Sequence, residues 1–210
     1  MAASPITWVN LYIPGELTLT HSDITVSQKG KAAAGEDVAV TVVNSDKTKP
    51  ITLFPRIPRW VSDTATVKVN GEVMNDAISK DACHPATGRW KSGDNVTLTL
   101  PAALRLIRTR DDSKMVSVFY GPVLLAGEPG IDTMSNDLPN KDTHLDLASI
   151  NVPDIANSSS APADWLESIN NSPLAYKAKD TGPATSIIFR PFCEVHHQRY
   201  FVYWKLQPAK

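Results

Sequence analysis

Acidic side chains could supply acid–base chemistry, and the chain carries 22 of them among 210 residues. Hydrolysis by a carboxyl pair needs two such groups about 5–10 Å apart, one held protonated by its surroundings. Most acidic residues here stand in turn sequences, where carboxylates are solvated and keep ordinary acidity. Glu194 lies instead in an aromatic stretch, yet a solvated or salt-bridged carboxylate is the favoured interpretation there too. We therefore predict no catalytic residue, and an independent hydrolase using Glu194 and a histidine is the least favoured hypothesis.

Histidine and cysteine do not form a metal-ligand pattern. Adjacent His196 and His197 on a strand would point to opposite faces, so they could not hold one ion together. Cys83 and His84 could offer two zinc ligands only with help from elsewhere, and a polar loop is the simpler interpretation. Cys83 and Cys193 are favoured as free thiols, with a disulfide in an oxidising compartment left open. We predict no metal site.

The five tryptophans are the strongest candidates for ligand binding, because an exposed indole can stack on a sugar ring. They are Trp8, Trp60, Trp90, Trp165 and Trp204. In a β-sandwich most tryptophans pack in cores or interfaces, and packing is the favoured interpretation here. Trp60 and Trp90, which stand beside polar turns, are the two candidate sugar-binding residues. Exposure tests the hypothesis, since two buried indoles would leave it without support.

Short strands must position these residues, because the dominant period of the sequence is two. Apolar side chains alternate with others over residues 38–43, 67–70 and 96–100, as in antiparallel sheets with one buried face. Asn70-Gly71 predicts a tight hairpin that pairs residues 65–70 with 72–78. Sixteen prolines disfavour long helices, and only residues 143–149 and 163–170 suggest short ones. We predict an all-β fold, an antiparallel β-sandwich or jelly-roll with a small C-terminal β extension.

A change of composition divides the chain. Strand-like segments fill residues 6–128, predicted to be the β-sandwich, and residues 129–162 have the polar composition of a linker or loop. Residues 163–210 are predicted to be the C-terminal β extension, which is too short for a comfortable core of its own. Residues 200–204 are apolar on both faces, as in a central strand or an edge covered by another domain.

Composition also excludes several classes of partner. The balance of 21 basic and 22 acidic residues argues against nucleic-acid binding, which needs clustered Lys and Arg. No apolar run approaches the ~20 residues of a membrane span. The first residues lack a signal-peptide pattern, and strand-like sequence starts near Trp8, so we expect an excised piece of a longer protein.

Four stretches and the ending, taken in order, resemble the region after the catalytic barrel in glycoside hydrolase family 127, the β-L-arabinofuranosidase-like group. The stretches are Trp8-Val9-Asn10-Leu11-Tyr12-Ile13-Pro14, Arg56-Ile57-Pro58-Arg59-Trp60, Trp90-Lys91-Ser92-Gly93-Asp94 with Leu98-Thr99-Leu100-Pro101, and Tyr120-Gly121-Pro122-Val123-Leu124-Leu125-Ala126-Gly127. The ending, residues 191–204, resembles the C-terminal extension of many members, with Cys193 where an aromatic is expected. The resemblance covers essentially the whole chain.

The resemblance implies an all-β region beside an (α/α)6 barrel that this chain lacks. In the family, a zinc-bound cysteine cluster with glutamates looks to be carried by that barrel, so no cofactor is expected here. It implies a non-catalytic accessory region that supports the upstream barrel or subunit contacts in an enzyme acting on arabinose-containing plant polysaccharide. A carbohydrate-binding module with exposed tryptophan is the alternative, and a homo-oligomer is left open. The parent protein is expected to be periplasmic or secreted and bacterial.

Overall fold

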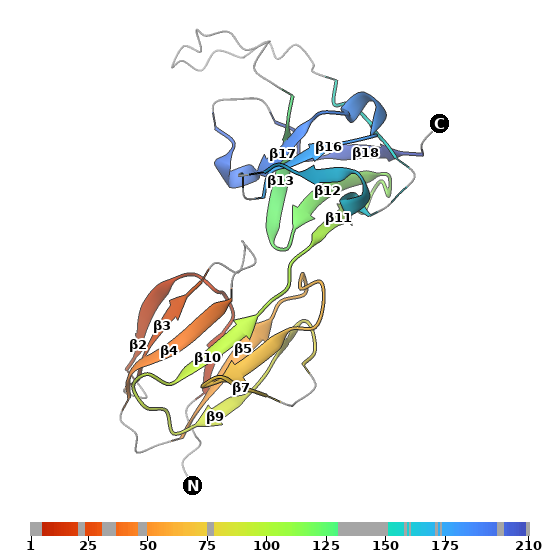
Figure 1. The fold of residues 1–210 in the computed structure, drawn as a ribbon. Coiled ribbons are helices and arrows are strands. Elements are labelled where there is room, and N and C mark those ends of the chain that lie inside the picture. Colours follow the sequence, from red (N-terminus) through yellow and green to blue (C-terminus); the bar gives the residue numbers. More distant parts are fainter. Residues whose placement is uncertain are drawn as a thin grey trace. The chain divides into compact units, whose positions relative to one another are not determined.

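The structure is a computed structural model, and it describes residues 6–20, 24–30, 37–45, 50–74, 78–129, 151–157, 159, 161–170, 172, 174–196 and 200–208. The chain divides into two compact units, Met1–Ala103 and Leu104–Lys210, which are treated separately below (Figure 1). Each unit has a hydrophobic core of its own. The regular elements of the described residues are strands and short 3-10 turns, which confirms the all-β prediction.

The first unit is a sandwich of two sheets around one core. A six-stranded antiparallel sheet has the order β2 (Gly15–Leu19), β3 (Ile24–Lys29), β4 (Val38–Ser45), β10 (Asn95–Thr99), β6 (Thr66–Val69) and β7 (Glu72–Val73). The smaller sheet contains β1 (Ile6–Val9), β5 (Ile51–Ile57), β8 (Ala82–Cys83) and β9 (Ala86–Gly88). β1 pairs with β5 in parallel, unlike the other pairs of this unit.

The alternating segments form this core as predicted. Val38, Val40 and Val42 on β4 are buried, and so are Val96 and Leu98 on β10. Each set occupies every second position, because successive side chains of a strand point to opposite faces. The two sets lie on neighbouring strands and share one face of the six-stranded sheet.

The predicted hairpin also forms. β6 and β7 pair antiparallel on either side of Asn70-Gly71. Both turn residues have positive φ, 51° at Asn70 and 85° at Gly71, which is the conformation that Asn-Gly favours. Within the longer predicted span, residues 75–77 lie outside the described part of the chain.

The second unit is built on one eight-stranded sheet. Its order is β14 (Ile155–Ala156), β18 (Trp204–Gln207), β12 (Met115–Tyr120), β13 (Val123–Glu128), β17 (Ile188–Pro191), β16 (Tyr176–Ala178) and β15 (Leu166–Ser168), with β11 (Leu104–Arg108) also paired to β12. Aromatic rings dominate its core. Phe189 packs 6.3 Å from Trp165 and 4.9 Å from Trp204 between ring centroids, and all three are buried.

The division between the units differs from the predicted one. The prediction kept residues 104–128 in the first sandwich, but β12 pairs with β18 and β13 with β17, so these strands belong to the second unit. The predicted linker 129–162 contains β14, whose Ile155 is buried, while residues 130–150 lie outside the described residues. The reason is long-range pairing, which the local change of composition did not reveal.

The helix predicted over residues 163–170 is wrong. A 3-10 turn, η2 (Pro162–Asp164), precedes strand β15, which pairs with β16. Burial of Trp165 and Leu166 in the second core favours this extended backbone. The other helical suggestion, residues 143–149, lies outside the described residues. None of the helices in the described residues is long and apolar enough to cross a bilayer.

Candidate functional site

The structure does not support Trp90 as a sugar platform. Its side chain is only 3% exposed and lies in the core of the first unit. The indole N–H donates a hydrogen bond to the carbonyl of Ile51 at 2.9 Å, so both the ring and its polar atom are engaged. Trp60 is half-buried and packs against the same core. Packing, the favoured sequence interpretation, explains both residues.

Trp8 is the tryptophan that the structure leaves exposed. Its side chain is 57% exposed, whereas Trp165 and Trp204 are buried in the second unit. The Trp8 ring stacks on Phe54 of β5 with 4.5 Å between ring centroids. Sequence reasoning chose Trp60 and Trp90 instead, because they stand beside polar turns, whereas Trp8 stands in a strand-like run. The missing information was that β1 lies at the end of its sheet.

Trp8 belongs to a larger exposed apolar surface. We define the β1–β2 surface as Trp8 on β1, Leu11 and Ile13 in the following loop, and Leu17 on β2. All four side chains are more than half exposed, and all four line one pocket. Neighbouring Ile6 is exposed as well. Clustered exposure of large apolar side chains marks an interaction site far more often than scattered exposure does.

The pocket has a volume of about 440 Å³ and reaches between the two sheets of the sandwich. Its apolar wall includes Val26 and Val40, two buried core residues. Its polar lining includes Thr7 and Gln28, whose side-chain oxygens Oγ1 and Oε1 are buried and have no hydrogen-bond partner among the described residues. Buried polar atoms are normally paired, so these two oxygens are unusual features of the pocket's surroundings.

The pocket exists because the sandwich is open at this end. Leu17 is paired in register with Val26, and opposite residues of an antiparallel pair place their side chains on the same face. Val26 points into the core at 5% exposure, so Leu17 also occupies a core-facing position. Leu17 is nevertheless 57% exposed, since no described strand of the smaller sheet covers this part of β2.

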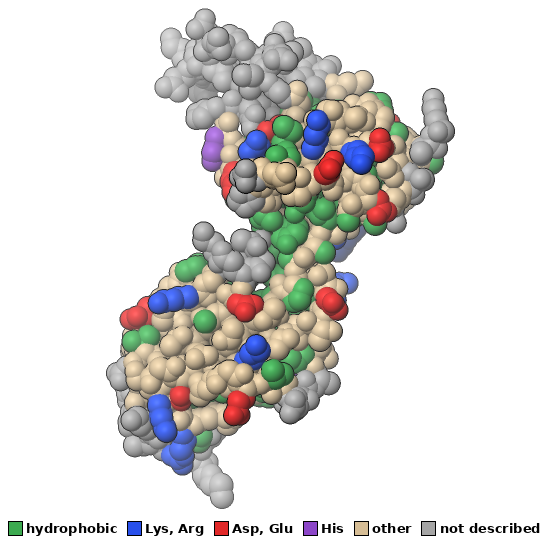
Figure 2. Space-filling model, in the orientation of Figure 1, with side chains coloured by type: hydrophobic (Ala, Val, Ile, Leu, Met, Phe, Trp, Pro, Cys, Tyr) green, Lys and Arg blue, Asp and Glu red, His purple; other side chains and the backbone are tan. Residues whose placement is uncertain are grey.

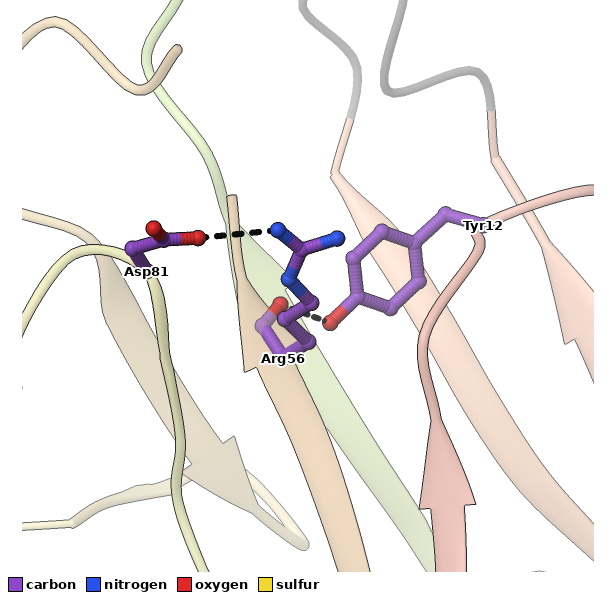
Figure 3. Close-up of polar contacts among 3 residues, drawn as sticks. All are labelled: Tyr12, Arg56 and Asp81. Carbon is purple, nitrogen blue, oxygen red and sulfur yellow. Dashed lines mark hydrogen bonds and ion pairs between the residues drawn. The ribbon is translucent and has the colours of Figure 1, made fainter. Parts of the chain in front are cut away.

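A polar cluster fixes the loop that carries Leu11 and Ile13 (Figure 3). The Tyr12 hydroxyl donates a hydrogen bond to the Arg56 carbonyl on β5. The Arg56 guanidinium in turn lies 2.8 Å from the Asp81 carboxylate. Burial, and next the charge of the neighbouring Cys83, raise the pKa of Tyr12 above its ordinary value, so its hydroxyl stays a donor. The cluster positions the loop and contains no acid–base pair.

The described residues considered for catalysis and metal binding are divided between the two units. Glu194 and His196 are exposed in the second unit, and His197 lies outside the described residues. Cys83 is half-buried in the first unit and Cys193 exposed in the second, both as free thiols. Within the described ranges no three His, Cys, Asp or Glu side chains gather as a metal site. These residues therefore do not fit the cysteine-rich zinc centre that the family resemblance implies for the barrel.

His84 is structural. Its Nε2 atom lies 3.1 Å from the backbone nitrogen of Ser79, which donates to it, and the side chain is buried. Charged side chains give no other signal of a site: on the face drawn in Figure 2, basic and acidic groups are interspersed on both units.

The geometry thus defines a class: an all-β protein of two units, one of them a sandwich with an exposed apolar surface at one edge. Residues 7–102 match the family model of the GH127 β-L-arabinofuranosidase middle domain, and residues 105–206 match that of a domain of unknown function. The two matches meet where the two units meet. Residues 7–102 therefore form a GH127-type middle domain, and the chain as a whole is a partial GH127-like region.

Solved structures have the same fold. A glycoside hydrolase superposes with a TM-score of 0.64 at 18% identity, over 95% of this chain and 36% of that one. A GH127 β-arabinofuranosidase gives 0.65 at 16%, over 99% and 36%. A GH127 β-L-arabinofuranosidase from Geobacillus stearothermophilus T6 gives 0.61 at 17%, over 99% and 34%. The chain spans about a third of the length of these proteins. No curated protein matches it.

Proposed function

We propose that this chain is a non-catalytic accessory region of a longer glycoside hydrolase, and that its β1–β2 surface docks on the rest of that polypeptide. The carrying observation is the set of four apolar side chains, each more than half exposed, around an open sandwich edge. Covering them would remove apolar area from water at about 25 cal/mol per Å². In the described residues Glu194 and His196 are exposed in the second unit and His84 is buried in the first, and this separation supports a role without chemistry of its own.

The docking partner in this proposal is an (α/α)6 barrel upstream in the same polypeptide. The zinc centre and the catalytic carboxylates would belong to that barrel, since the residues described here do not fit them. Arabinose-containing plant polysaccharide is the substrate class we propose for the parent, following the names of its structural relatives. We propose a periplasmic or secreted location for it.

Association in trans tests the proposal. The parent without this region should bind the separately produced 210-residue chain and gain thermal stability from it. Trp8→Ser should weaken this binding by roughly tenfold or more, because large apolar anchors dominate such interfaces. Val73→Ser is the matched control: Val73 is 53% exposed but lies on β7, at the end of the six-stranded sheet opposite β2. Equal binding by both variants, or no binding at all, would contradict the proposal.

Carbohydrate binding is the second candidate, and an aromatic pair in the second unit favours it. Phe192 and Tyr200 are 41% and 46% exposed, with ring centroids 5.1 Å apart in an edge-to-face arrangement. Exposed aromatic faces can stack on sugar rings, which Trp90 cannot do. Saturable NMR shifts of these two rings on titration with arabinan oligosaccharides would favour this function. No response at millimolar sugar would exclude it.

A further inference from the structure

We infer that the open edge of the first unit receives one further β-strand, which pairs with β1 and covers the core face of β2. The inference rests on the proposed docking, because it takes the strand from the part of the polypeptide outside this chain. It assigns the pocket a ligand class, an extended peptide segment, rather than a sugar or a lipid.

The first argument is that β1 and β2 are both unpaired on one side. β1 pairs only with β5, and β2 only with β3, as far as the described residues reach. Figure 1 shows β2 at the outer end of its sheet. Sandwich sheets face each other about 10 Å apart, so a strand beside β1 would lie over β2.

The second argument is that β2 presents two core-facing positions to empty space. Leu17 shares the face of buried Val26, and Gly15 shares the face of Gln28, its register partner. Leu17 is 57% exposed. A Cβ placed on Gly15 would meet nothing within 4 Å. The core-facing side of β2 therefore has an apolar residue at a buried-type position, but no described strand covers it.

The third argument comes from hydrogen bonding. The pocket contains the buried oxygens Thr7 Oγ1 and Gln28 Oε1, neither with a partner among the described residues. An acyl chain has no hydrogen-bond donor to offer to either oxygen. A peptide brings backbone N–H donors for these oxygens and apolar side chains for Val26 and Val40. Peptide chemistry therefore fits the lining better than a lipid does.

The fourth argument is that this edge lacks the usual protection. Natural edge strands carry Lys, Pro or inward charges, or are covered by another segment. The two strands read Ile-Thr-Trp-Val over 6–9 and Gly-Glu-Leu-Thr-Leu over 15–19, with Glu16 as their single charge. The solved structures that share the fold are about three times as long as this chain, so a parent of that size has ample sequence for the strand.

Hydrogen exchange in the longer parent polypeptide and in the 210-residue chain tests the inference. The outward amides of Ile6–Val9 should exchange about 100-fold more slowly in the parent, because ladder hydrogen bonds protect amides. Gly15→Leu, which puts a side chain into the pocket, should abolish this protection and lower the melting temperature of the parent. The same variant should fold and melt normally in the 210-residue chain. Gly15→Ala is the matched control and should behave as wild type in both.

Three outcomes would overturn the inference, and they separate it from the docking proposal. If Trp8→Ser weakens docking but the amides of β1 exchange equally fast in parent and chain, docking stands and strand addition fails. If Gly15→Leu melts the parent and the isolated chain alike, the pocket is part of the unit's own packing. If β1 becomes protected in the isolated chain as its concentration rises, with dimers in light scattering, a second copy supplies the strand.

Discussion

Tyr12 connects two sequence stretches that lie 44 residues apart. Its hydroxyl binds the Arg56 carbonyl, so the loop after β1 is fastened to β5 through a single side chain. Arg56 is held from its other side by Asp81 in an exposed ion pair, which contributes little energy in water. The buried hydroxyl is therefore the contact that positions Leu11 and Ile13, and its protonation matters for the stability of the first unit.

Alkaline pH should destabilise the first unit through Tyr12. Because the folded pKa is raised, the unfolded chain loses this proton first, near pH 10, and the free energy of unfolding then falls by about 1.4 kcal/mol per pH unit. The stabilisation is complete below pH 10 and is lost as the pH rises toward the folded pKa. Urea unfolding at pH 9 and pH 11 measures this slope.

Tyr12→Phe is the variant that isolates the effect, since Tyr12 is the one tyrosine of residues 1–103. It should cost about 1 kcal/mol at neutral pH for the lost hydrogen bond. It should also flatten the alkaline slope of this unit, whereas Tyr203→Phe, at an exposed site in the second unit, should not. A slope unchanged by Tyr12→Phe would mean that this hydroxyl is not held protonated by the fold.

At the residue scale, the sequence could not separate an exposed tryptophan from a buried one. Trp90 is buried in the core and bonded to the carbonyl of Ile51, 39 residues away, whereas Trp8 lies on the face of β1 opposite to buried Val9. The residues around each indole did not show which of the two would be buried. Burial of a tryptophan therefore had to come from the structure.

At the scale of elements, the sequence correctly predicted the features that depend on contacts between neighbouring residues. The Asn70-Gly71 hairpin and the alternating strands β4 and β10 needed only neighbouring residues. Local signals could not predict which unit β13 belongs to, because its partner β17 begins 60 residues after the end of β13. The helix expected at residues 163–170 failed for a similar reason, since pairing with β16 outweighed the local helical signal.

Gly127 on β13 lies in a closely packed part of the second unit. A Cβ at this position would lie 2.2 Å from Trp204 and 3.1 Å from Ile187. The backbone of Gly127 also exchanges two hydrogen bonds with Phe201, at 2.8 and 2.9 Å. Glycine is required here because the Trp204 ring lies directly on the backbone. As a result, β13 packs closely against residues 201–204.

Gly127→Ala should therefore destabilise the second unit by about 1–3 kcal/mol, as overpacking of a tight core does. Hydrogen exchange read separately for the two units during urea unfolding gives the measurement. The first unit should keep its stability. Gly15→Ala serves as the control for the added methyl group, because its Cβ meets nothing within 4 Å. Equal small effects at both glycines would mean that Trp204 moves aside freely.

At the scale of the whole molecule, the two cores share no residue. The first draws on strands β1 to β10, and the second on strands from β11 onward. Each unit has about a hundred residues, a common size for an independent domain. The family models divide at the same place, between residues 102 and 105. The unit boundary is thus a property of packing and of sequence family together.

Splitting the chain at this boundary should give two folded proteins. Residues 1–103 and 104–210, produced separately, should each show dispersed NMR spectra and a cooperative unfolding transition. The control is a split after residue 128, which leaves β12 and β13 on one fragment and their partners β18 and β17 on the other. Fragment 129–210 should then be unfolded or aggregated, since it loses Val116, Val118 and Leu125 from its core. If both splits gave equally folded fragments, β12 and β13 would not be integral to the second unit, and its sheet would end at β17.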